Sequence, residues 1–295
     1  MLAEAAIKFI AYKYSMSDIG MIQHPFDDAL KLHWAGAGEP NTWLGETSAA
    51  YWNMVGPFGG TTAATALQAV MLHPDLLGEP IALTVNYAAA IAAGPFRVIA
   101  RPVRTNRSTQ HWMIELSQTG ASDETLVVTT ASAITAVRRQ TWSASDMPMP
   151  SVSFSDSLPV FSFKGAAWTQ RYDTRVACGM VPDVWDGTGQ DSLTQLWVRD
   201  HPPRPLDFLS LAAMSDVFYP RVWLRRATRV PAGTVSITTY FHADSAQLTK
   251  AGAGYVLAQA KAQTFSNGFF DQTAQLWSQS GDLLATSNQI VYFKE

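Results

Sequence analysis

The chain has 295 residues, of which 47% are hydrophobic and 15% charged, with a formal net charge of −3 at pH 7. This content is enough for a sizeable core and argues against disorder, which requires low hydrophobicity and high charge. The charge also argues against a nucleic-acid partner, because such proteins need a basic stripe to neutralise phosphates. The lone Cys178 cannot form an intramolecular disulfide, which favours a cytoplasmic location.

Residues 1–24 form an N-terminal extension without a basic region ahead of its apolar part, which argues against a signal peptide. Two later stretches resemble membrane segments in composition. Residues 47–72 are interrupted by glycines and a proline, and residues 81–96 are shorter than the ~20 residues needed to cross a bilayer. The sequence therefore predicts no membrane span.

Residues 25–140 show the order of a helix followed by strands. A Gly-Pro-Phe-Gly-Gly segment at 56–60 precedes residues 61–72, whose small apolar side chains are typical of a helix buried on nearly all sides. Runs rich in β-branched and aromatic residues then predict strands at 81–87, 96–104, 111–118 and 125–137. A helix followed by a meander of strands indicates an α+β fold and not a βαβ fold.

A segment rich in Ser, Pro and Met at 141–160 predicts a linker. The same order of elements then recurs in residues 161–295. Aromatic residues at 161–176 predict a strand region, and a helix is predicted at 206–219, ending before Pro220. Further strands are predicted at 234–241, 255–264, 272–279 and 283–293.

The two halves also align with each other. Residues 81–87 (IALTVNY) match 236–242 (SITTYFH), and residues 116–129 match 276–287 around a common turn. The alternative is a chance similarity between two β meanders. Because the helix, the turn and the strand order all recur, we interpret the pattern as an internal repeat of one fold.

Five segments in this order resemble the thioesterase II (TesB-like) acyl-CoA thioesterases. They are FGG at 58–60, LTVNY at 83–87, the pair Arg138-Arg139, RPLDFLSLAAMSD at 204–216 and TVSITTYFH at 234–242. The resemblance runs from about residue 25 to the C-terminus. It implies an α+β double hotdog, in which each fused half is a long helix wrapped by an antiparallel sheet. It also implies an enzyme of lipid and fatty acid metabolism that hydrolyses acyl-CoA to free acid and CoA.

In that family an Asp, a Thr and a Gln hold the attacking water, and by position these roles fall on Asp216, Thr234 and Gln289. The residues themselves support Asp216, which has no Lys or Arg three or four residues away. Burial would raise the pKa of such a carboxylate and suit it to act as a general base. The alternative is an exposed Asp at the solvent edge of the helix. Thr234 and Gln289 rest on the resemblance alone.

Asp207 is a competing carboxylate, but it lies in the first turn of the predicted helix. A negative charge there complements the helix dipole, so we interpret Asp207 as structural. The helix of the first half carries no carboxylate. The sequence therefore predicts one site per chain.

Four residues are candidates for binding substrate. Gly59 and Gly60 precede a helix whose free backbone N–H groups could face the thioester carbonyl, although they could equally serve only close packing. Arg104 and Arg107 could meet CoA phosphates, but arginines at strand edges are usually just solvated. The six histidines lack metal-ligand spacing, so we expect no metal and no cofactor.

Two other functions remain open on the same fold. One is a non-catalytic module that binds acyl-CoA or an acyl carrier. The other is a hydratase or dehydratase, which would need a His and an Asp paired near the active helix. A serine hydrolase lacks support, because no G-x-S-x-G motif occurs. The sheet edges that a chain of two fused halves leaves exposed predict a symmetric homodimer.

Overall fold

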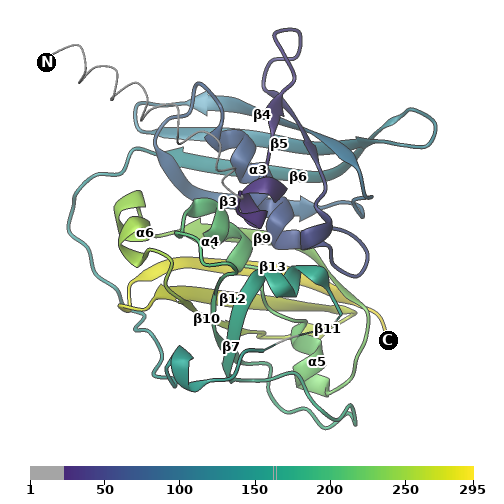
Figure 1. Cartoon of the computed structure of the whole chain (residues 1–295), viewed down its shortest axis with the longest axis vertical. Helices are drawn as coiled ribbons and strands as arrows, with labels where there is room; N and C mark the ends of the chain where they lie inside the picture. Colours follow the sequence, from purple (N-terminus) through teal and green to yellow (C-terminus); the bar gives the residue numbers. More distant parts are fainter. Residues whose placement is uncertain (1–22, 162, 164) are drawn as a thin grey trace, which may run out of the picture.

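The computed structural model describes residues 23–161, 163 and 165–295 (Figure 1). The predicted extension therefore lies outside the described residues, except for Gln23 and His24. The elements up to residue 136 are α2 (Pro25–Ala29), β1 (His33–Trp34), β2 (Thr42–Glu46), the 3-10 turn η1 (Ala49–Tyr51), α3 (Gly59–Met71), β3 (Glu79–Tyr87), β4 (Pro95–Thr105), β5 (Thr109–Thr119) and β6 (Thr125–Ala136).

The later elements begin with two 3-10 turns in the connecting region, η2 (Ser155–Ser157) and η3 (Ala167–Arg171). They continue with β7 (Tyr172–Cys178), β8 (Thr194–Asp200), α4 (Phe208–Met214), α5 (Arg221–Arg226), β9 (Ala232–Phe241), α6 (Ser245–Ala251), β10 (Val256–Lys261), β11 (Phe265–Ser266), β12 (Phe269–Ser278) and β13 (Leu283–Phe293).

The strands form one continuous antiparallel sheet in the described part of the chain. Its order is β1-β2-β4-β5-β6-β3-β9-β13-β12-β10-β8-β7, with β11 paired to β12. Strands β3 and β9 pair at the centre, with Val85 opposite Ile237, and join the two halves (Figure 1). On either side of this pair the order β2-β4-β5-β6-β3 is repeated by β8-β10-β12-β13-β9. The strand order of the predicted repeat is therefore present in both halves.

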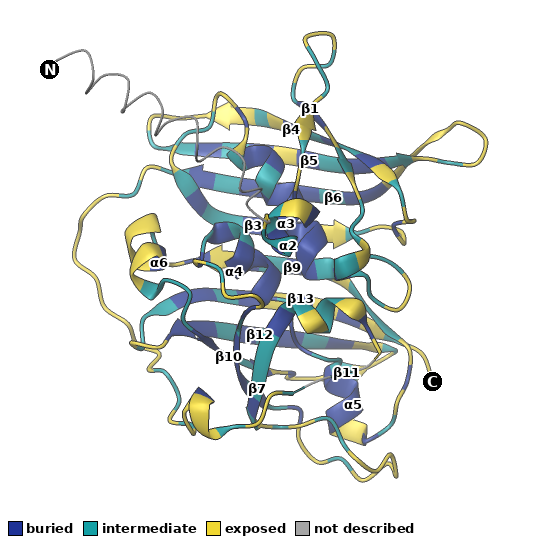
Figure 2. Ribbon diagram, in the orientation of Figure 1, coloured by how far each residue is buried: buried dark blue, intermediate teal, exposed yellow. Residues whose placement is uncertain are grey.

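Helices α3 and α4 pack against each other inside the curved sheet (Figure 2). Ten of the thirteen residues of α3 are buried, as its small apolar side chains predict. The helices approach so closely that a Cβ on Gly60 would lie 2.4 Å from the carbonyl oxygen of Ala213. Glycine at residue 60 is therefore required for this contact, since real Cβ atoms do not approach other atoms so closely.

The second helix differs from its prediction. Residues 206–219 were expected to be helical, but α4 ends at Met214 and a turn separates it from α5. The Ser215 hydroxyl bonds back to the Leu211 carbonyl at 2.9 Å, and Pro220 disfavours helical backbone at the preceding residue. Asp216 consequently lies in the turn after α4 and not within a helix.

Other short elements were not predicted. They include β1, β8, α5, α6 and β11, and α6 begins with a capping box between Asp244 and Gln247. In the strand region expected at 161–176, residues 167–171 instead form η3, and a strand begins at Tyr172. Among the described residues, no helix has the length and apolar character needed to cross a membrane.

Candidate active site

The N-terminus of α3 and the turn after α4 meet beside a cavity of about 500 Å³. Its polar lining comes from both halves of the sequence. Asp216 follows α4, Thr234 lies on β9 and Gln289 lies on β13, while Gly59 and Tyr87 come from α3 and β3. The rest of the wall is largely apolar and aromatic, and includes Phe161, Phe163, Phe218, Trp223 and Phe270.

The structure brings Asp216, Thr234 and Gln289 into direct contact. The Thr234 hydroxyl donates to Gln289 Oε1 at 3.2 Å, and Gln289 Nε2 donates to Asp216 Oδ1 at 3.0 Å. The same nitrogen also contacts the Ser215 carbonyl oxygen at 3.4 Å. The amide of Gln289 therefore has its oxygen directed to a donor and its nitrogen directed to two acceptors, which defines its orientation.

Pairing of β9 with β13 explains how residues so distant in sequence meet. Thr234 pairs with Val291, and Ile237 pairs with Gln289, with a register shift between Ile290 and Val291. This shift places Thr234 and Gln289 within hydrogen-bonding distance on the side of the sheet that faces α4. The β9–β13 register and the end of α4 together assemble the trio.

Asp216 is partly buried and borders the cavity. Burial raises the pKa of its carboxyl group to about 7, while hydrogen bonds from Gln289 and from the backbone N–H of Gly60 act in the opposite direction. No Lys or Arg in the described part of the chain forms an ion pair with it. A carboxyl group with this pKa can exchange a proton near neutral pH, as a general base must.

The two glycines predicted to bind substrate have different surroundings. A Cβ on Gly59 would lie 2.7 Å from Asp216 Oδ2, so this glycine leaves space beside the carboxylate. Gly60 does not line the cavity, and its missing side chain admits the backbone of α4. Close packing therefore accounts for Gly60, whereas substrate binding by Gly59 stays a prediction.

Tyr87 is part of the site, although the sequence did not single it out. Its hydroxyl donates to the Gly59 carbonyl oxygen at 2.7 Å and holds the first residue of α3. Burial, and then the charge of Asp216, raise the pKa of this hydroxyl well above its usual value, so it remains a donor. Its place at the end of the LTVNY segment, which contributes to the family resemblance, was the available signal.

Arg104 and Arg107 are not brought to this site. They lie at the β4–β5 turn and do not line the cavity. Register places that turn beside Glu79, because Glu79 pairs with Ala136 and Ala136 pairs with Thr109. Tyr87 is at the other end of β3, roughly 26 Å away at ~3.3 Å per strand residue. The expected contact of these arginines with CoA stays a prediction without support from the cavity.

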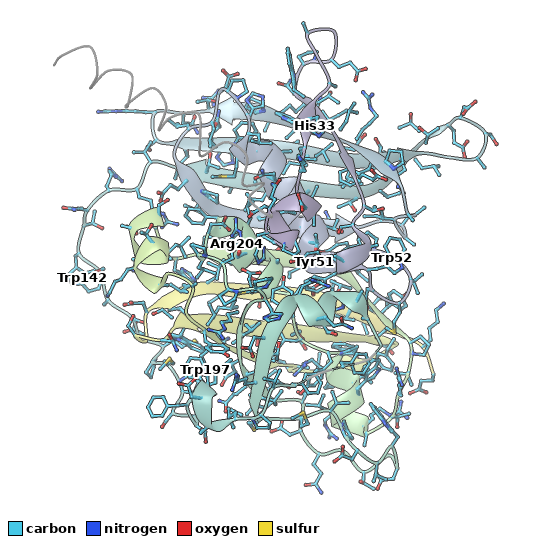
Figure 3. The ribbon with its side chains drawn as sticks, in the orientation of Figure 1. His33, Tyr51, Trp52, Trp142, Trp197 and Arg204 are labelled. Atoms are coloured by element: carbon cyan, nitrogen blue, oxygen red, sulfur yellow. The ribbon has the colours of Figure 1, made fainter. Side chains whose placement is uncertain are left out.

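The N-terminus of α4 is capped by protein side chains and is not free to bind a ligand. Asp207 is the N-cap and accepts from the Ser210 backbone N–H at 2.8 Å. Arg204 forms ion pairs with Asp27 and Asp207, and Figure 3 shows it near Tyr51 at the centre of the molecule. Asp207 therefore has the structural surroundings that its position predicted. The corresponding end of α3, by contrast, opens on the cavity.

No group of three His, Cys, Asp or Glu side chains in the described ranges is arranged to hold a metal ion. No histidine of the described chain lines the cavity. Cys178 is exposed and does not line the cavity. The chemistry available at this site is that of a carboxylate, a hydroxyl, an amide and the backbone of a helix N-terminus.

Comparison with known families gives two matches. Residues 48–136 match the acyl-CoA thioesterase N-terminal domain, and residues 143–293 match the acyl-CoA thioesterase C-terminal domain. Comparison with curated protein sequences gives no match.

Several solved structures resemble the chain over nearly its whole length. A conserved hot dog fold protein of unknown function from Alicyclobacillus acidocaldarius is 46% identical, with a TM-score of 0.86 over 93% of this chain and 99% of that one. A putative thioesterase II from Thermobifida fusca is 18% identical, with a TM-score of 0.76 over 92% and 97%. The acyl-CoA thioesterase II TesB2 from Mycobacterium marinum is 18% identical, with a TM-score of 0.71 over 91% and 98%. These similarities confirm the predicted α+β double hotdog fold.

Proposed function

The chain belongs to the acyl-CoA thioesterase family, and from that premise we propose that it hydrolyses acyl-CoA to free acid and CoA with water activated by Asp216. The observation that carries the proposal is the continuous hydrogen-bonded chain from Thr234 through Gln289 to Asp216 at the cavity wall. Thioester hydrolysis itself is the activity of the family. The assignment of these three residues to it is part of this proposal.

Asp216 acts as the general base in this mechanism. Gln289 holds Oδ1, so Oδ2 on the Gly59 side is the oxygen available to a water. The Thr234 hydroxyl donates to Gln289, and its lone pairs remain to accept a hydrogen from the same water. Asp216 takes a proton as the water oxygen attacks the thioester carbonyl carbon. When the C–S bond breaks, the proton passes to the CoA sulfur.

The N-terminus of α3 stabilises the oxyanion that forms during this attack. The N–H of Gly60 is directed to Asp216, whereas the N–H of Gly59 has no partner within the helix. Gly59 lines the cavity and presents this donor at the positive end of the helix dipole. Loss of one such donor costs ~10²–10³ in rate in other enzymes.

The remaining cavity receives the acyl chain. Its volume of about 500 Å³ lies within the ~300–1,000 Å³ of typical ligand pockets. Phe161, Phe163, Phe218 and Trp223 give it an apolar wall that suits hydrocarbon. A hydratase or dehydratase has less support, because no histidine of the described chain borders Asp216 or the cavity.

A non-catalytic module that binds acyl-CoA or an acyl carrier also has less support. Such a protein has no need for a carboxylate near neutral pKa at the cavity wall, and an ion-paired or solvent-facing Asp216 would have favoured it. We further propose that the enzyme is cytoplasmic, works in fatty acid metabolism and forms a homodimer.

The test measures release of free CoA thiol from acyl-CoA thioesters of several chain lengths. The parent protein should hydrolyse some of them, and Asp216→Asn should lower kcat by ~10²–10⁴, the usual contribution of a general base. Asp207→Asn is a matched control, because it changes a carboxylate at the other end of α4. Hydrolysis by Asp216→Asn at the parent rate would show that the site assignment is wrong.

A further inference from the structure

Gln272 is a polar residue on the inner face of β12 that the mechanism above does not use. The same face of the strand carries Phe270 and Ala274, both buried. Gln272 pairs directly with Gln289 on β13, so both side chains point to the same side of the sheet. Both line the cavity, and Gln272 is only 4% exposed. Its amide therefore faces the acyl site one strand beyond the trio.

The Gln272 amide has no hydrogen-bond partner among the described residues. Other glutamines of the sheet are satisfied. Gln110 bonds to Leu77, Asp75 and Thr105, and on the outer face the amides of Gln195, Gln259 and Gln275 bond to one another in a row. Because it borders the cavity, only water or a ligand can satisfy this amide. An amide that is unpaired and directed into a cavity is a site for a polar group of a ligand.

We propose that Gln272 binds a hydroxyl or oxo group on the acyl chain, so that the preferred substrates are acyl-CoA thioesters with such a group near the thioester. This inference rests on the proposed function. Directly opposed residues in a sheet have Cβ atoms ~4.5–5.5 Å apart, and Gln289 contacts Asp216, so Gln272 lies within a few carbon atoms of a thioester attacked by water at Asp216. An amide both donates and accepts, and can therefore bond to a hydroxyl or to a ketone.

The residues around Gln272 should increase the preference for acyl chains that carry a hydroxyl or oxo group. Phe270, Val291 and Trp223 are apolar neighbours in the cavity lining and offer no other partner to the amide. An unsubstituted acyl chain would displace water from Gln272 and leave its amide unpaired. Sites built to hydrogen-bond a substrate group reject analogues without it far more strongly than apolar pockets reject an extra methylene.

The experiment compares kcat/KM for 3-hydroxyhexanoyl-CoA, 3-oxohexanoyl-CoA and hexanoyl-CoA. The parent protein should prefer at least one substituted thioester by roughly tenfold or more, and Gln272→Leu should abolish or reverse that preference. Gln275→Leu is the matched control on the same strand, because its amide lies on the outer face, and it should keep the preference. Since Gln272→Leu removes an unpaired buried amide, its Tm should not fall.

Each failure has a distinct meaning. The inference is overturned if the parent prefers substituted over unsubstituted thioesters by less than twofold, or if Gln272→Leu leaves the preference unchanged. In either case Gln272 would bind only water. If no thioester is hydrolysed, the proposed function fails, and calorimetric binding of the three thioesters to the parent protein decides the role of Gln272. Equal affinities for all three would then overturn it. If Gln272→Leu does not fold, Gln272→Met provides the same comparison.

Discussion

Gln289 should control the pH at which the enzyme becomes active. In the parent protein the pKa of Asp216 is about 7, and the hydrogen bond from Gln289 is a cause that lowers it. Gln289→Leu removes that bond and places an apolar group beside the carboxylate. Both changes disfavour the ionised form of Asp216, so the acid limb of the kcat/KM profile should move to higher pH.

The size of the shift follows from the bond that is lost. A hydrogen bond to a charged group contributes ~1.5–3 kcal/mol, and one pKa unit corresponds to ~1.36 kcal/mol, which predicts a shift of ~1–2 units. With a pKa near ~8.5, about 1% of Asp216 would be ionised at pH ~6.5, against roughly a quarter in the parent protein. Ionisation alone then lowers kcat/KM roughly 25-fold at that pH.

The assay measures kcat/KM for one acyl-CoA from about pH 5 to about pH 10, following loss of the thioester absorbance. Activity of Gln289→Leu should recover partly at high pH, where Asp216 ionises, and any remaining deficit reports lost orientation. Thr234→Val should shift the acid limb less, since it removes the donor to Gln289 and an acceptor for the water but leaves the bond from Gln289 to Asp216. Thr234→Ser should retain most activity. An acid limb of Gln289→Leu at or below the parent midpoint would refute the reasoning.

Three further predictions concern packing, pH and assembly. Gly59→Ala should lower kcat at least tenfold with little change in Tm, because its Cβ would lie 2.7 Å from Asp216 Oδ2. Gly60→Ala should lower the Tm measured by circular dichroism, because its Cβ would lie 2.4 Å from the Ala213 carbonyl oxygen. Equal effects of both variants on Tm would contradict this distinction. Burial raises the pKa of Asp200 from 3.8 to about 7, so between these values the folded state holds a proton that the unfolded state has lost. This group's contribution to the free energy of unfolding should therefore fall by ~4 kcal/mol as pH rises from ~3 to ~8. Asp200→Asn should reduce that pH dependence in urea unfolding, and an unchanged slope would exclude the shifted carboxyl as its source. Light scattering in dilute solution should give the mass of two chains, and a monomer alone would contradict the predicted homodimer.

Much of the fold could be predicted because its signals are local. The apolar composition of 61–72 and the β-rich runs reflect which side chains face the core, so α3 and the long strands lie where expected, within a few residues. The internal repeat predicted the common strand order of the two halves. The length of α4 could not be predicted, because its end depends on Ser215 and Pro220 together.

The candidate site could also be predicted only in part. Sequence alone indicated Asp216 as a carboxylate without a cationic neighbour, and only the family resemblance indicated Thr234 and Gln289. Their contact depends on a register shift in the pairing of β9 with β13, which no local pattern specifies. Arg104 was expected to bind the same substrate as the trio, but the direction of the strands places Arg104 and the cavity at opposite ends of the first half.

The inferred role of Gln272 and the contact of Tyr87 with Gly59 depend on the tertiary structure. Each occupies one position in an alternating strand, where a single polar residue has no distinctive sequence signal. Only the sheet shows that Gln272 faces the cavity opposite Gln289, and only helix packing shows that Tyr87 holds Gly59. The sequence by itself determined which segments are apolar and how they repeat, because those properties follow from composition and period. The tertiary structure decided which polar groups share the cavity, because that depends on register and on where helices end.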